Sequence, residues 1–167
     1  SLALGEAGCQ IAMAASDQPF LEQMSGRLSS EGIHPLPIST SLSDAQTAQE
    51  ATKKVMAQFG QIDVLVNSPW VEFAKPFVEV NTTEFNEQIN RNVTSIFHFC
   101  QSVGAQMLKR KQGAIMNLVS ALAIRAMPNT TVFCMTMAAV HHLTKALALE
   151  WAREGIRVNA VGLGWFS

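Results

Sequence analysis

The sequence contains no tyrosine, so no phenol hydroxyl is available anywhere in the chain as a general acid or base. Charged residues are also scarce, at 15% of the 167 residues, and they nearly cancel to a net charge of −1. No basic stripe or charge run occurs, which argues against nucleic acid or an anionic membrane as a partner. No signal peptide or membrane-spanning run is recognised, so a cytoplasmic location is expected.

Cysteine is represented by three widely spaced residues, Cys9, Cys100 and Cys134, each in an apolar context. Their number is odd, and their spacing fits neither a metal site nor a disulfide framework. We expect three buried thiols of an intracellular protein. The adjacent His141 and His142 would point to different faces of a helix, so no metal site is expected.

Hydrophobic residues make up 48% of the chain, and its length is that of one domain with a well-buried core. Apolar runs and helical periodicity alternate along the chain. They predict strands at 9–14, 34–38, 62–67, 114–120 and 156–162, and helices at 18–31, 44–59, 83–109 and 131–153. This alternation indicates a parallel sheet with right-handed crossovers.

Three segments carry a resemblance to a known family: FGQIDVLVN at 59–67, AAVHHLTKALALEWAR at 138–153 and GIRVNAVGLGW at 155–165. They resemble the short-chain dehydrogenase/reductase family, and the resemblance spans essentially the whole chain. It implies an α/β fold in a single domain over 1–167, a Rossmann-type doubly wound parallel sheet in three α/β/α layers. Relative to that family we expect the fold to be incomplete at both ends, without the first strand and its Gly-rich turn and without the C-terminal substrate loop and last strand.

The family's catalytic pattern is a serine followed thirteen residues later by Tyr-x-x-x-Lys. Here the corresponding positions are Ser120, Phe133 and Met137, so the serine is kept and the proton donor and its lysine are not. Asn92 matches the asparagine that supports the family's proton relay. Without tyrosine and lysine we interpret Ser120 as inherited architecture and Asn92 as a structural hydrogen-bonding residue, and we assign no catalytic residue.

The cofactor positions implied by the resemblance are also altered. Asn67 begins the family's Asn-Asn-Ala-Gly motif, but Ser68 and the following proline and tryptophan depart from it and are expected to crowd the cleft. Ser41 stands where the family has an aspartate near the adenine, and Asp17 either bonds a ribose hydroxyl or caps a helix. Because the Gly-rich turn that would hold a pyrophosphate is missing, no cofactor is expected for this chain alone.

Three functions remain open. The first is a non-catalytic member of the family, either a pseudoenzyme or the inactive subunit of a heteromeric oxidoreductase. The second is an NAD(P)-dependent oxidoreductase, similar to carbonyl or 3-oxoacyl reductases, whose ends lie outside this sequence. The third is a non-redox enzyme on the same scaffold, which would need a replacement acid or base near Ser120, and none is found. We expect the first.

Two expectations concern assembly. The helices at 83–109 and 131–153 carry broad apolar surfaces, which in the family pack against a partner subunit. A homo-oligomer, or a hetero-oligomer with an active family member, is therefore expected. The family's first strand would lie between the strands at 9–14 and 62–67, and we expect another segment or chain to fill that slot rather than direct pairing of Ala12 with Leu65.

Overall fold

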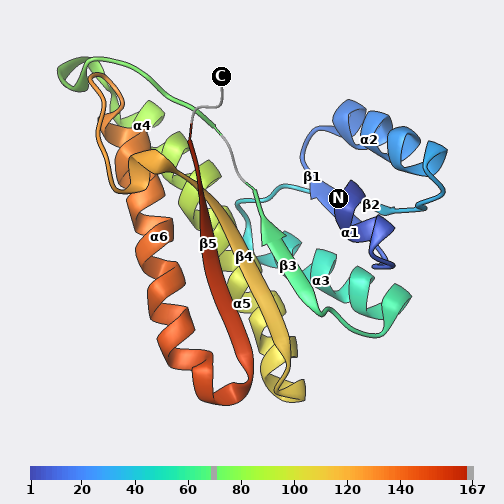
Figure 1. Ribbon diagram of the computed structural model, residues 1–167. Helices are drawn as coiled ribbons and strands as arrows, with labels where there is room; N and C mark the ends of the chain where they lie inside the picture. Colours follow the sequence, from blue (N-terminus) through green and yellow to red (C-terminus); the bar gives the residue numbers. More distant parts are fainter. Residues whose placement is uncertain (69–70, 165–167) are drawn as a thin grey trace. The chain divides into compact units, whose positions relative to one another are not determined.

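The computed structural model describes residues 1–68 and 71–164, and the chain divides into two compact units, Ser1–Gln61 and Ile62–Ser167 (Figure 1). The first unit comprises α1 (Leu2–Glu6), β1 (Ala12–Ala15), α2 (Gln18–Ser30), β2 (Leu36–Ser39) and α3 (Ala45–Phe59). The second comprises β3 (Val64–Asn67), η1 (Phe77–Glu79), α4 (Thr82–Ile89), η2 (Asn90–Thr94), α5 (Ser95–Arg110), β4 (Gly113–Ser120), η3 (Ala121–Ala123), α6 (Thr131–Trp151), η4 (Ala152–Glu154) and β5 (Ile156–Leu163). Whether both units form one domain stays a prediction.

The first unit pairs β1 with β2 in parallel, with Ala12 opposite Leu36. Both strands begin two or three residues later than the sequence predicts. Pro35 has no N–H to donate, so pairing begins at Leu36, whose N–H donates to the Ile11 carbonyl at 2.8 Å. The predicted helices are confirmed. Asp17 and Asp44 cap the starts of α2 and α3 through their side chains.

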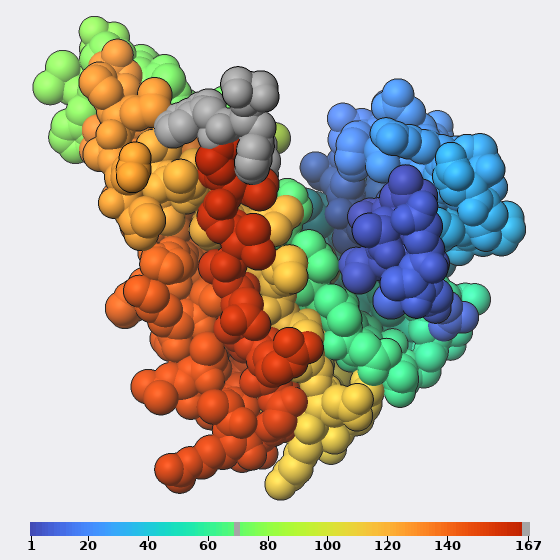
Figure 2. Space-filling model, in the orientation of Figure 1, coloured from blue at the N-terminus to red at the C-terminus, as the bar shows by residue number. Residues whose placement is uncertain are grey.

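The second unit contains a parallel sheet in the order β3-β4-β5, and α5 and α6 lie against one face of it (Figure 1). That face buries Ile115 and Val119 of β4 and Val158 of β5 in the core formed with the two helices. The strand predicted at 62–67 was expected to be wholly buried, which is wrong for one face. Val64 and Val66 point the other way and are exposed, and β5 is visible at the surface in Figure 2.

The helix predicted at 83–109 is present but is not regular throughout. A π-helical segment, η2, separates α4 from α5. A polar side chain competes there for a helix carbonyl group, because the Ser95 hydroxyl donates to the Arg91 carbonyl at 2.7 Å. The Thr94 hydroxyl donates to the Asn90 side chain at 3.5 Å. Apolar periodicity alone does not reveal this change of winding.

The helix α6 carries the site residues and ends against β5. Gly155 follows it with φ 74°, and a Cβ at this position would lie 2.2 Å from the Lys111 carbonyl oxygen, so the predicted glycine cap is confirmed. By length and composition alone, Thr131–Glu154 could cross a membrane. Core helices of soluble proteins also pass that test, and α6 buries Val132 and Val140 inside the second unit.

The expected slot beside β1 and β3 bears on strand pairing. Among the described residues, β1 pairs with β2 and β3 pairs with β4, so Ala12 and Leu65 belong to different sheets. The direct pairing that would contradict the expectation is therefore not among these pairings. What lies along the other edge of β1 and along the other edge of β3 stays a prediction.

Candidate active site

Ser120 lies at the carboxyl end of β4, the edge at which open α/β sheets bind ligands. The residue is buried, and its Oγ accepts the Leu122 N–H at 3.2 Å as the chain enters η3. A hydroxyl that accepts this bond still has its own proton to donate. Ser120 is thus suited to hydrogen-bond a carbonyl or alkoxide oxygen.

Phe133 and Met137 lie one turn apart on α6, as predicted, and both face the core. Their side chains are 3% and 0% exposed and belong to the cluster that includes Leu122 and Val140. Neither side chain can exchange a proton. At these two positions α6 supplies neither a phenol nor an ammonium.

Asn92 connects three parts of the second unit. Its Oδ1 accepts the Val71 N–H at 3.3 Å, and its Nδ2 lies within hydrogen-bonding distance of the Val71 carbonyl (3.2 Å), Gln88 Oε1 (3.1 Å) and Thr136 Oγ1 (3.4 Å). Thr136 in turn donates to the Phe133 carbonyl at 2.8 Å. The expected bond to a neighbouring strand is replaced by bonds to the segment after β3 and to α6, so Asn92 positions the start of α6 against residue 71.

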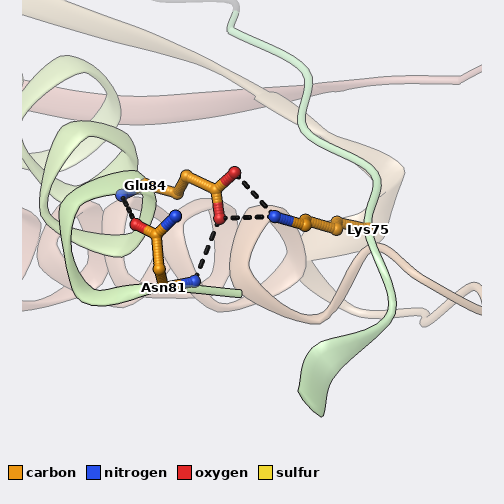
Figure 3. A network of polar contacts seen from close by, with 3 residues as sticks. All are labelled: Lys75, Asn81 and Glu84. Carbon is orange, nitrogen blue, oxygen red and sulfur yellow. Dashed lines mark hydrogen bonds and ion pairs between the residues drawn. The ribbon is translucent and has the colours of Figure 1, made fainter. Parts of the chain in front are cut away.

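A second connection holds the same segment from its other end (Figure 3). Lys75 Nζ lies 2.8 and 2.9 Å from the two carboxylate oxygens of Glu84, which also accepts the Asn81 N–H at 3.0 Å. The hydrogen bonds from Lys75 and Asn81 lower the pKa of the Glu84 carboxyl. The backbone N–H of Lys75 donates to the Asn129 carbonyl at 2.7 Å, two residues before α6 begins. Segment 71–80 is thus fixed to α4 and to the loop preceding α6.

The first unit places Asp17 and Ser41 after the carboxyl ends of β1 and β2. Asp17 Oδ1 accepts the Phe20 N–H at 3.0 Å, which confirms the helix-cap interpretation. Both side chains are exposed, and this edge of a parallel sheet suits the hydroxyls of a nucleoside ribose. The residues present fit the adenosine end of a dinucleotide, and their contact with one stays a prediction.

Asn67 and Ser68, the other cofactor candidates, differ in orientation. Asn67 is buried and donates to Asn117 Oδ1 at 2.8 Å and to the Cys100 sulfur at 3.4 Å, so its side chain is committed to the core. Ser68 is exposed at the end of β3. The proline and tryptophan expected to crowd the cleft, Pro69 and Trp70, lie outside the described residues.

Comparison with known proteins supplies the deciding observation. The profile of the short chain dehydrogenase family matches residues 1–167. The chain belongs to the short-chain dehydrogenase family. A curated relative, the 3-oxoacyl-(acyl-carrier-protein) reductase FabG of Staphylococcus epidermidis, is 31% identical over 166 residues, which are 99% of this chain and 68% of the relative.

Solved structures agree with that assignment. NAD+-bound xylitol dehydrogenase superposes with a TM-score of 0.94 at 26% identity, over 99% of this chain and 64% of its own. The gluconate 5-dehydrogenase of Burkholderia cenocepacia in complex with NADP and tartrate superposes with a TM-score of 0.91 at 26% identity, over 98% and 64% of the two chains. The predicted Rossmann-type parallel α/β fold is confirmed, and the chain spans about two thirds of the length of these relatives.

The family relatives correct two expectations drawn from the sequence. The non-catalytic interpretation is wrong, because the matched proteins are named as reductases and dehydrogenases. The expectation of no cofactor is not supported either, since the two solved relatives hold NAD+ and NADP. The non-catalytic interpretation gave too much weight to Phe133 and Met137. These two residues say nothing about Ser120 or about the ligand-binding edge of the sheet.

A buried amide network inside the family fold was missed by sequence reasoning. Asn117 of β4 accepts from Asn67 and donates from Nδ2 to Thr144 Oγ1 at 2.8 Å, which joins β3, β4 and α6. An asparagine in the middle of an apolar strand is the signal that could have revealed it, because a buried amide requires partners.

We expect Asn117→Ala to lower the free energy of unfolding by about 1–3 kcal/mol, because it leaves the Asn67 amide buried without its acceptor. The matched control is Asn159→Ala on β5, whose exposed side chain should matter by less than about 0.5 kcal/mol. Urea denaturation monitored by circular dichroism measures both. Equal effects of the two substitutions would contradict the assignment of the network.

The cysteines differ from the expectation of three buried thiols. Cys100 is buried, Cys134 is partly buried and Cys9 is exposed, because Cys9 precedes the paired part of β1. Burial raises the pKa of the Cys100 thiol to about 12, and hydrogen bonds with Asn67 and Asn117 oppose this shift only in part. Among residues 1–68 and 71–164, no group of three or more His, Cys, Asp or Glu side chains could hold a metal ion.

We therefore expect a thiol reagent at pH 8 to modify Cys9 rapidly and to leave Cys100 unmodified in the folded protein. With a pKa near 12, the thiolate fraction of Cys100 at this pH is about 10⁻⁴, and its side chain is shielded. Mass spectrometry of the labelled peptides locates the modified residue, and the urea-unfolded chain serves as the fully reactive control. Labelling of Cys100 before Cys9 would contradict the structure.

Proposed function

We propose that the polypeptide carrying this chain is an NAD(P)-dependent oxidoreductase that interconverts a carbonyl compound and its secondary alcohol. The observation that carries the proposal is Ser120, which lies at the ligand-binding edge of the sheet with a hydroxyl proton free to donate. The family relatives support the reaction class, since FabG is named as a 3-oxoacyl reductase.

In this reaction Ser120 hydrogen-bonds the substrate's carbonyl oxygen and stabilises the negative charge that develops on it. A bound nicotinamide would supply or accept the hydride. Because Phe133 has no proton to give, the proton reaches the alkoxide from water through the Ser120 hydroxyl. Asn92, through Thr136, keeps the first turns of α6 in place beside this centre. Asp17 and Ser41 would hold the adenosine end of the cofactor.

Loss of a positioned general acid lowers a rate by ~10²–10⁴, so the turnover should be slow relative to tyrosine-containing relatives. The test is reduction of a carbonyl panel with NADH and with NADPH, followed by loss of the reduced nucleotide and by identification of the alcohol. Product formation above the protein-free rate is expected. Its absence with both nucleotides, in a protein that is folded, would overturn the proposal.

The proposal includes assembly and location. The helices at 83–109 and 131–153 expose Phe97, Met135 and Leu149, and the last is 83% exposed. Phe99 and Leu147 are partly buried already. An oligomer that covers these side chains, with identical subunits or with another family member, would remove apolar surface from water. No nucleic acid or membrane is proposed as a partner, and the location proposed is the cytoplasm.

We expect light scattering at micromolar concentration to give a dimer or larger assembly. Leu149→Glu should shift it toward smaller species, because a charge would be buried in the contact. The control is Phe20→Glu, which also replaces an apolar residue by a charged one but lies on α2, outside the helices at 83–109 and 131–153. A stable monomer of the unsubstituted protein would contradict the proposed assembly.

A further inference from the structure

We draw no further inference here: the strongest candidate, the hollow of about 190 Å³ in the first unit that is lined by the turns after α1 and α2 and by Cys9 and His34, rests on one cysteine, and nothing in the part of the chain that the structure describes shows what would bind there.

Discussion

Phe133→Tyr combined with Met137→Lys should raise the rate of carbonyl reduction by ~10²–10⁴. The substitutions supply a phenol on α6 and, one helical turn away, an ammonium that lowers the phenol's pKa from its ordinary value of about 10 toward neutrality. The two side chains project from the same face of α6, so the new groups would lie close enough to interact. The measurement is the initial rate of nucleotide oxidation at a saturating concentration of a carbonyl substrate from the same panel.

The single variants separate acid catalysis from repacking. Met137 is wholly buried, so Met137→Lys alone should destabilise the protein and give no gain in rate. Phe133→Tyr alone preserves the ring and adds one hydroxyl, so it should fold and give a smaller gain. A folded Phe133→Tyr protein with an unchanged rate, together with an inactive double variant, would show that position 133 does not face the reacting atoms.

Ser120→Ala should lower kcat by ~10²–10³, which is the loss typical of removing one donor to a developing oxyanion. The effect should fall on kcat more than on KM, because the hydrogen bond strengthens as charge develops on the oxygen. The variant also removes the acceptor of the Leu122 N–H, so the free energy of unfolding of the variant must be measured alongside its rate.

The control for Ser120→Ala is Ser29→Ala on the exposed face of α2, which removes a hydroxyl far along the chain from the site. Equal rates of the two variants would mean that Ser120 does not touch the substrate. Ser120→Thr, which keeps a hydroxyl, should restore part of the rate.

Sequence patterns predict most of the fold because strand and helix periods differ and because caps are local. Asp44 and Gly60, for example, bound α3 at the predicted positions. Patterns fail where tertiary contacts decide. An apolar run at 62–67 does not tell which face of β3 is covered, and Cys9 lies in an apolar context but outside the paired part of its strand. The network of Asn67, Asn117 and Thr144 joins residues up to 77 positions apart by sequence number, which no local pattern can show.

The candidate site shows the same division. The resemblance to the family implies the positions Ser120, Phe133 and Met137, and the composition alone shows the absence of a phenol. The placement of segment 71–80 follows from neither, since it depends on the bond between Lys75 and Asn129, residues of two loops. The non-catalytic interpretation was wrong because the absence of the family's tyrosine was taken to exclude the reaction. Hydride transfer also depends on the serine and on the ligand-binding edge of the sheet.

The length of the π-helical segment η2 sets the angle by which α5 is rotated about the helix axis relative to α4. Each residue of an α-helix turns the chain by about 100°, so removing one residue from 90–94 to restore regular winding would rotate α5 by that angle relative to α4. Ile96, Cys100 and Val103 would then leave the sheet, and polar positions such as Gln101 would turn inward. The length of this segment is therefore fixed by the need of two helices to face different neighbours, and insertions or deletions should be tolerated in the loops on either side but not within it.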